Sequence, residues 1–371
     1  MLSDERVLRL GHAFREHTGR VPQGGWSAPG RVNLIGEHTD YNGGLALPFA
    51  IDRQTLAAVA LRDDDELRCW SLQDESDSWL AYPQGVRRAL VDAGVKVGGA
   101  DIVVDSDVPT GRGLSSSAAL ECAIAIALNE LAGGGLDRMQ LAEACQSAEN
   151  TEVGAQTGVM DQLASLFGEA GSMLLFDARS RQVTPVATTF DGLVLLVIDT
   201  GVRHSNAGAG YSDRRRECAE AAELLGVSSL REAGLGEVAD LASGEGREGL
   251  LGRRARHVFT ENVRVSRAAA LLRAGRARDL GPLLNASHAS LRDDFDVSAP
   301  ELDVAVDAAT EAGALGARLV GGGFGGSALV LATVDDELPV RRGVLAAYAK
   351  QDWPEPSIFP VTPSEGARRF R

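Results

Sequence analysis

Hydrophobic and polar residues follow two different spacings along the chain, and each spacing predicts a different kind of element. Near the start, residues 3–17 carry apolar side chains at Val7, Leu8, Leu10 and Phe14. Side chains three or four positions apart lie on one face of a helix, so this segment predicts a short amphipathic helix.

The rest of the chain mixes predicted helices with predicted strands. Helices are expected over 116–131 and 138–151, and most of 211–315 has helical spacing. Strands are expected at 45–61, 102–104, 172–177, 193–198, 319–320 and 328–332. The segment 193–198 is almost wholly apolar, which favours a central position in its sheet.

Helices and strands in this mixed order predict an α+β fold in two lobes. A length of 371 residues also exceeds the usual size of one domain. We place the boundary between the predicted domains so that they cover residues 1–185 and 186–371. The cleft between two domains is then the first place to expect a ligand site.

Composition narrows the classes of function. Hydrophobic residues make up 44% and charged residues 24% of the chain, as in an ordinary soluble globular protein. The net charge of −15 argues against nucleic-acid or anionic-membrane partners. The lysines are Lys96 and Lys350, and neither lies in a Gly-x-x-x-x-Gly-Lys-Ser/Thr motif. If the protein binds ATP, it therefore does so without a P-loop lysine.

The cysteines Cys69, Cys122, Cys145 and Cys218 lie far apart and form no Cys-x-x-Cys pair. This pattern is typical of reduced cytosolic thiols rather than of disulfides or a zinc site. The first residues, Met1–Arg6, are charged and do not resemble a signal peptide. We therefore expect a cytoplasmic protein with no membrane partner.

A stretch rich in glycine and serine lies between a predicted strand and a predicted helix, at Gly111, Arg112, Gly113, Leu114, Ser115, Ser116 and Ser117. Glycines allow backbone N–H groups to approach an anion closely, and a helix start adds free donors and partial positive charge. Serine hydroxyls can cap the helix or bind a ligand. The stretch therefore suits a triphosphate with Mg²⁺; the alternative is an ordinary capped helix after a glycine turn.

Two acidic residues follow this stretch. Glu149 lies one helical turn after Cys145, on or near an apolar face. A carboxylate in that position is costly unless it is paired or bound to a metal. Asp161 lies within Gly158–Gln162, where it is either a functional carboxylate or the N-cap of a helix.

A third candidate is the glycine-bounded segment from Gly30 to Gly44, which crowds polar residues together at Arg31, Glu37, His38, Thr39 and Asp40. Such a mixture of donors and acceptors suits a ligand with many hydroxyl groups, and the alternative is a solvated loop. No second histidine stands at metal-ligand spacing from His38.

A fourth candidate, Gly321–Gly326, lies between two apolar strands. It predicts either a tight hairpin or a loop that closes over a ligand. A dinucleotide-binding motif is excluded because the stretch precedes a strand rather than a helix.

These motifs together resemble the GHMP family of small-molecule kinases, and within it the galactokinase branch. The segment Gly30–Gly44 resembles the signature of that branch, whereas Gly111–Ala118 and Gly321–Gly326 resemble glycine motifs shared across the family. Further similar segments are Gly158–Gln162, Ser290–Asp294 and Pro300–Asp303, in the expected order.

The resemblance implies a role for each matching residue. It implies a transition-state arginine at Arg31 and a catalytic aspartate at Asp161. The implied sugar-binding residues are Glu37, His38, Thr39, Asp40, Gly158 and Tyr211. The implied nucleotide loop covers residues 111–117, and the implied Mg²⁺ ligands are Ser117 and Glu149.

The family fold is α+β with two lobes, an N-terminal lobe like a ribosomal-protein domain and a C-terminal lobe with a ferredoxin-like part. The implied reaction moves the γ-phosphoryl group of ATP to the C1 hydroxyl of galactose, the entry step of galactose metabolism. ATP, Mg²⁺ and galactose are the expected ligands, and we expect a monomer.

Two other functions stay open on the sequence. One is a galactose sensor that binds sugar and ATP without turnover, which intact Arg31, Ser115–Ala118, Glu149 and Asp161 argue against. The other is a kinase for a neighbouring sugar such as N-acetylgalactosamine or arabinose, because acceptor choice depends on the shape of the pocket.

Overall fold

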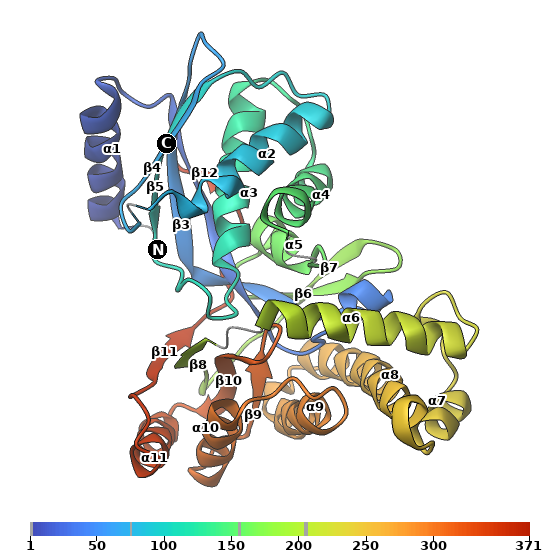
Figure 1. Ribbon diagram of the computed structural model, residues 1–371. Coiled ribbons are helices and arrows are strands. Elements are labelled where there is room, and N and C mark those ends of the chain that lie inside the picture. The colour runs from blue at the N-terminus through green and yellow to red at the C-terminus, as the bar shows by residue number, and fades with distance from the viewer. Residues whose placement is uncertain (1–2, 75, 155–156, 204–206) are drawn as a thin grey trace.

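The computed structural model describes residues 3–74, 76–154, 157–203 and 207–371, which form two lobes around shared strands (Figure 1). The helices are α1 (Asp4–Thr18), α2 (Ala81–Asp92), α3 (Ser116–Leu131), α4 (Arg138–Ala148), α5 (Met160–Phe167), α6 (Ala207–Leu224), α7 (Leu235–Ala242), α8 (Gly246–Arg273), α9 (Gly281–Asp293), α10 (Pro300–Glu311) and α11 (Glu337–Lys350). The strands are β1 (Gly24–Asn33), β2 (Leu45–Ala46), β3 (Pro48–Leu61), β4 (Leu67–Ser71), β5 (Ala100–Ser106), β6 (Ser172–Asp177), β7 (Gln182–Ala187), β8 (Leu193–Arg203), β9 (Gly316–Val320), β10 (Gly325–Thr333), β11 (Ser357–Val361) and β12 (Arg368–Arg369).

The predicted helices are confirmed where the apolar spacing is regular. Helix α1 begins after Ser3, whose hydroxyl accepts a hydrogen bond from the backbone N–H of Arg6, and it buries Leu10 and Phe14. Helix α3 runs over the predicted range. Helix α4 ends early, because its last predicted residues form the π-helical turn η3 (Glu149–Val153).

The N-terminal lobe is built on a sheet with the order β12-β1-β3-β5-β4. Helix α1 covers one face of this sheet, and helices α2 to α5 cover the other (Figure 1). Strand β3 is buried on both sides: Leu56 and Ala58 pack toward α1, whereas Ala57 and Val59 join the core under α3. These residues alternate between the two faces of the sheet because successive side chains of a strand point to opposite sides.

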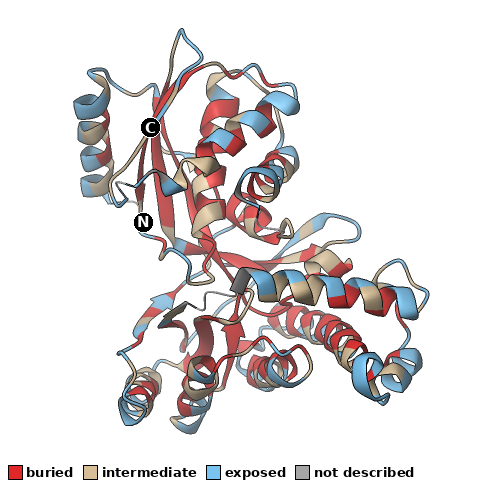
Figure 2. Ribbon diagram, viewed as in Figure 1, coloured by how far each residue is buried: buried red, intermediate tan, exposed pale blue. Residues whose placement is uncertain are grey.

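The C-terminal lobe is built on an antiparallel sheet with the order β11-β8-β10-β9. Strand β8 lies inside the sheet, as its apolar sequence predicts. Its Leu196 and Ile198 pack with the helices of this lobe, whereas Leu195 and Val197 pack in one cluster with Val32 of the N-terminal lobe. The two lobes therefore share a hydrophobic core, and buried residues continue through the strands of both (Figure 2).

A small third sheet with the order β2-β6-β7 lies at the junction of the lobes. The boundary that we placed between residues 185 and 186 falls inside β7, and β12 returns from the end of the chain to pair with β1. The division into 1–185 and 186–371 stays a prediction, whereas the two-lobed α+β fold is confirmed. Within the described ranges, no helix has the length and apolar character needed to cross a membrane.

Candidate active site

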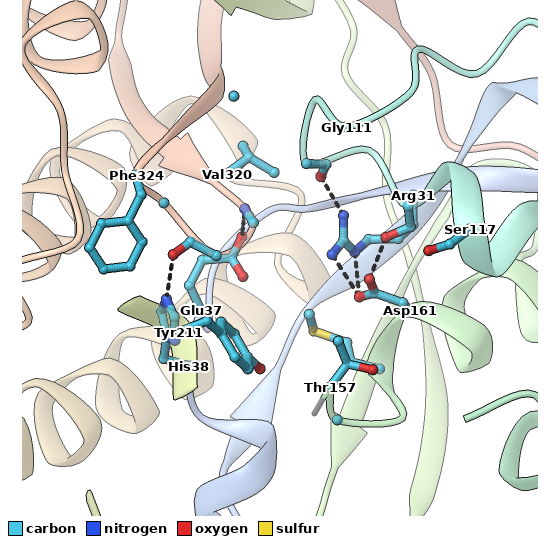
Figure 3. Close-up of a pocket in the computed structure, with 18 of the residues that line it drawn as sticks. Arg31, Glu37, His38, Gly111, Ser117, Thr157, Asp161, Tyr211, Val320 and Phe324 are labelled. Atoms are coloured by element: carbon cyan, nitrogen blue, oxygen red, sulfur yellow. Dashed lines mark hydrogen bonds and ion pairs between the residues drawn. The ribbon is translucent and has the colours of Figure 1, made fainter. Parts of the chain in front are cut away.

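A cavity of about 440 Å³ lies where the lobes meet (Figure 3). Five segments that are far apart in sequence line it. They supply Arg31, Glu37, His38 and Asp40; Gly111, Gly113 and Ser115–Ser117; Thr157, Gly158, Met160 and Asp161; Val202 and Tyr211; and residues 320–326. The structure therefore brings together most of the residues that the sequence predicts to be functional.

Arg31 and Asp161 form an ion pair at the centre of this cavity (Figure 3). Arg31 lies on β1 rather than in a loop, and Asp161 lies in the first turn of α5. Nε of Arg31 donates to Oδ1 of Asp161 at 2.8 Å, and Nη2 lies 2.6 Å from the same oxygen. The guanidinium is 5% exposed, and burial opposes its charge while Asp161 favours it, so that its pKa is raised overall.

The glycine and serine stretch meets this pair from the start of α3. The carbonyl oxygen of Gly113 accepts a hydrogen bond from Nη1 of Arg31, and Ser115 donates from Oγ to Oδ2 of Asp161. Ser115 has a left-handed backbone, with φ of 56°, and in the described chain its side chain makes no capping bond. The alternative of an ordinary capped helix is therefore wrong, because this hydroxyl is used to orient Asp161.

Asp161 also does not cap a helix. The residue before α5 is Val159, and the Asp161 side chain points to Arg31 and Ser115. Figure 3 shows Arg31 and Asp161 facing one another, with Ser117 beside them and Glu37, His38 and Tyr211 across the cavity.

Glu149 lies behind the start of α3, at the beginning of the π-helical turn η3. Its carboxylate accepts hydrogen bonds from Ser117 at 2.8 Å, Thr157 at 3.1 Å and Gln162 at 2.8 Å. Burial, and then the negative charge of Asp161, raise the pKa of Glu149. None of the arginines and lysines in the described ranges forms an ion pair with Glu149.

On the opposite wall, loop 36–45 carries Glu37, His38 and Asp40. Oε1 of Glu37 accepts a hydrogen bond from the backbone N–H of Gly321 at 2.8 Å, and Nη2 of Arg318 lies 3.1 Å away. These contacts cross from the N-terminal lobe to the β9–β10 hairpin. They anchor the Glu37 carboxylate where the two lobes meet.

His38 is held by aromatic neighbours and two polar contacts. Nδ1 lies 2.8 Å from the hydroxyl of Tyr41, and Nε2 lies 3.2 Å from the carbonyl oxygen of Gly322. A carbonyl can only accept, so Nε2 carries the proton and Nδ1 accepts from Tyr41. Burial lowers the pKa of His38 to about 3, which leaves the ring neutral.

Asp40 lies against Gly158, in direct contact with its backbone. A Cβ atom added to Gly158 would lie 1.6 Å from Oδ2 of Asp40, so a larger residue at position 158 would displace this carboxylate. Burial, and then the charge of Asp161, raise the pKa of Asp40 to about 6. Tyr211 closes the same region, with its ring 5.2 Å from that of His38, and burial raises the pKa of its phenol.

Besides Glu149, three residues of the predicted site support the cavity from behind rather than lining it. The hydroxyl of Thr39 donates to the carbonyl oxygens of Gly36 and Leu45, which closes loop 36–45 internally. The side chain of Arg112 pairs with Asp199 at 3.3 Å. Leu114 is fully buried, and its carbonyl oxygen accepts the backbone N–H of Arg31 at 3.1 Å.

The structure also places residues in the site that our sequence analysis did not assign to it. Gly321–Gly326 joins β9 and β10 as a hairpin turn, as one alternative predicts, and it also lines the cavity, whereas its closing over a ligand stays a prediction. Thr157, Met160, Val202 and Val320 carry no signal in the sequence that separates them from ordinary core or loop positions. The buried Arg318 could have been singled out as a charge inside an apolar strand.

Comparison with known protein families agrees with this arrangement. Residues 12–61 match the galactokinase galactose-binding signature. Residues 81–169 match the GHMP kinases N terminal domain, and residues 268–350 match the GHMP kinases C terminal domain.

Individual relatives cover nearly the whole chain. A galactokinase from Streptomyces coelicolor is 47% identical, over 97% of this chain and 98% of its own length. A galactokinase from Mycobacterium tuberculosis is 41% identical, over 93% of this chain and 99% of its own length. The crystal structure of Lactococcus lactis galactokinase complexed with galactose superposes with a TM-score of 0.93, at 31% identity, covering 98% of this chain and all of that one.

A more distant structure shares the fold alone. The crystal structure of L. major mevalonate kinase in complex with R-mevalonate superposes with a TM-score of 0.65 at 22% identity, covering 91% of this chain and 95% of that one.

Proposed function

The chain belongs to the galactokinase family of the GHMP kinases, and we propose that its cavity transfers the γ-phosphoryl group of ATP to the C1 hydroxyl of galactose. The observation that carries the proposal is the Arg31–Asp161 pair, which lies between the glycine and serine stretch on one side and loop 36–45 on the other. A phosphoryl donor on the first side and a sugar on the second would meet at this pair.

Asp161 has the geometry of a proton acceptor. Arg31 and Ser115 hold its two carboxylate oxygens from different directions, so the carboxylate has one orientation toward the cavity. Asp161 accepts the proton of the sugar hydroxyl as that oxygen attacks the γ-phosphorus. A positioned acid or base of this kind contributes about 10²–10⁴-fold to a rate.

Arg31 takes the place of the lysine that a P-loop would provide. A guanidinium has five N–H donors. Arg31 hydrogen-bonds Asp161 through Nε and Gly113 through Nη1, and its Nη2 is ion-paired with Asp161. One N–H on Nη1 and one on Nη2 are left for oxygens of the transferring phosphoryl group. Phosphoryl transfer depends mainly on such positioning and charge stabilisation.

Ser117 and Glu149 would hold Mg²⁺. Their hydroxyl and carboxylate, which hydrogen-bond to one another at 2.8 Å, are oxygen ligands that this cation accepts, and the buried Glu149 carboxylate also feels the negative charge of Asp161. Mg²⁺ takes one or two protein ligands together with phosphates and water, so the absence of a cluster of three acidic or histidine ligands in the described ranges agrees with such a site. When bound, it would neutralise charge on the β- and γ-phosphates.

Glu37, His38, Asp40 and Tyr211 supply the directional contacts that a sugar needs. Galactose differs from glucose in the orientation of one hydroxyl, so recognition depends on hydrogen bonds rather than on volume. With glucose, buried polar groups of the site lose their partners. We therefore expect kcat/KM for glucose to be at least ~100-fold lower than for galactose.

The test is coupled ADP release with galactose, glucose, N-acetylgalactosamine and arabinose at matched concentrations. Galactose should be the best substrate, and NMR of the product should show phosphate at C1. A preference for another sugar would contradict galactose as the substrate. Tight binding of galactose and ATP without ADP release would indicate a galactose sensor instead of a kinase.

We also propose that the protein is cytoplasmic and monomeric. The described cysteines are free thiols, which supports the cytoplasmic compartment predicted from the sequence. We expect a monomer, and light scattering at assay concentration checks this.

A further inference from the structure

One face of α8, in the C-terminal lobe, holds loop 36–45 of the N-terminal lobe. Nε2 of His257 lies 3.1 Å from the carbonyl oxygen of Glu37. One turn further along, Oε1 of Glu261 accepts the backbone N–H of Gly36 at 2.9 Å. Oδ1 of Asn262 accepts the backbone N–H of Leu45 at 2.7 Å. The helix therefore binds the backbone of this loop at its start and at its end.

The side chains that hold the loop are themselves locked by α9. Oγ of Ser290 lies 2.9 Å from Nδ1 of His257, and Oγ of Ser287 donates to Oε1 of Glu261 at 2.7 Å. His257 and Glu261 are fully buried. A site group keeps its geometry when a second layer of packed, hydrogen-bonded residues supports it, and α8 and α9 provide such a layer here.

The backbone of the loop at this point needs external support. His38 has a φ of 62°, which a residue with a side chain rarely adopts. The peptide between Glu37 and His38 directs both side chains, and its carbonyl is the group that His257 contacts. The ring of Phe295 packs 4.8 Å from His38 and 4.5 Å from His257, so the two histidines share one wall.

We propose that His257 is a positioning residue for sugar recognition: by donating from Nε2 to the Glu37 carbonyl, it fixes the peptide that directs Glu37 and His38 into the cavity. This inference rests on the proposed role of loop 36–45 in binding galactose. A ring that donates from Nε2 accepts from Ser290 at Nδ1, so the neutral tautomer satisfies both contacts. Burial lowers the pKa of His257 to about 4, in agreement with a neutral ring.

Two substitutions separate the contacts of His257. In His257→Gln the side-chain amide can take the place of Nε2 and still donate to the Glu37 carbonyl. In His257→Asn the shorter side-chain amide takes the position of Nδ1. This variant therefore keeps the contact with Ser290 and loses the contact with the Glu37 carbonyl. We expect KM for galactose to rise about tenfold or more in His257→Asn, with KM for ATP within about twofold of the parent. In His257→Gln, KM for galactose should stay within about threefold.

Tyr348→Phe is the matched control. The Tyr348 hydroxyl is a buried donor to a backbone carbonyl, that of Glu301, at 2.7 Å in the same lobe, and Tyr348 does not line the cavity. It should lower the melting temperature without changing either KM. Equal effects of His257→Asn and His257→Gln on KM for galactose would overturn the proposal, as would equal changes in the two KM values of His257→Asn.

If the His257 variants do not fold, Ser290→Ala tests the same contact from behind. It releases Nδ1 and should raise KM for galactose about threefold with KM for ATP unchanged; an unchanged KM for galactose would overturn the role. The parent protein separates this inference from the proposed function. A parent that does not phosphorylate galactose contradicts the function, whereas an active parent with an unaffected His257→Asn variant contradicts only the positioning role.

Discussion

Arg31 shows how the neighbours of one side chain divide its donors between two tasks. Its contacts with Asp161 and Gly113 join β1, α5 and the loop before α3 at one point. The remaining N–H groups are those that we propose bind the transferring phosphoryl group. An ammonium group could not make this set of contacts, because it lacks the planar, forked geometry of guanidinium.

Replacing Asp161 tests the central step of the reaction. Asp161→Asn keeps the size of the side chain but removes the charge that accepts the proton. We expect kcat to fall about 10²–10⁴-fold. ATP binding, measured by calorimetry, should change little because the proposed role of Asp161 is toward the sugar hydroxyl and not toward the nucleotide. A kcat within about threefold of the parent would show that Asp161 has no catalytic role.

The Asp40 carboxyl predicts a pH dependence of sugar binding. Burial raises its pKa to about 6 from the usual 3.8, so the folded protein binds this proton more readily than the unfolded chain does. Between about pH 4 and pH 6, the contribution of Asp40 to the free energy of unfolding therefore decreases as the pH rises. The charged carboxylate is then available to accept hydrogen bonds from sugar hydroxyls above about pH 6.

We expect kcat/KM for galactose to decrease as the pH is lowered through about 6, because this ratio reports groups of the free enzyme. His38 cannot cause the change, since its pKa is about 3. The control is Asp40→Asn. Its kcat/KM for galactose should be lower than that of the parent and should not change with pH around 6. An inflection that persists in Asp40→Asn would assign it to another group.

At the scale of elements, the start of α3 and the π-helical turn η3 form one unit. The hydroxyl of Ser117 and the carboxylate of Glu149 meet across it, and Thr157 and Gln162 complete the hydrogen bonds of that carboxylate. Single π-helical turns of this kind are frequent at functional sites.

Glu149→Gln tests whether this unit holds Mg²⁺. The substitution keeps the size and most of the hydrogen bonds but removes the charge that a hard cation prefers. The Mg²⁺ concentration for half-maximal rate should rise at least about tenfold, measured at saturating galactose. Glu152→Gln, on the same turn and paired with Arg88, is the control and should leave the titration unchanged. An identical titration in Glu149→Gln would place the metal ligand elsewhere.

At the scale of the whole molecule, the end of the chain completes the N-terminal lobe. Strand β12 pairs with β1, the backbone N–H of Ala367 donates to Ser165 at 2.8 Å, and the Arg369 guanidinium lies 5.1 Å from the ring centre of Trp26. The C-terminal segment therefore stabilises the lobe that carries Arg31, although it lies outside the cavity.

Deleting residues 366–371 should lower stability without changing the chemistry. The lost contacts correspond to about 3 kcal/mol of the free energy of unfolding, and for a chain of 371 residues the melting temperature should fall by roughly 4 °C. Both KM values should stay within about twofold of the parent below the transition. An unchanged melting temperature would show that β12 adds nothing to the N-terminal sheet.

Features that depend on neighbouring residues in the chain could be predicted from the sequence. The helical spacing of apolar residues predicted α1, and continuous apolar runs predicted α3 and the inner strand β8, because an element buried on all sides is apolar throughout. The glycine and serine motifs indicated where the backbone would approach a ligand.

Only the tertiary structure decided where the polar side chains of the motifs point. Ser115 contacts Asp161 instead of capping α3, and Thr39 turns inward to close its own loop. His257 reaches the Glu37 carbonyl from 220 positions away. A side chain in a loop takes the direction that offers it partners and space, and distant segments supply both, so no local pattern records the outcome.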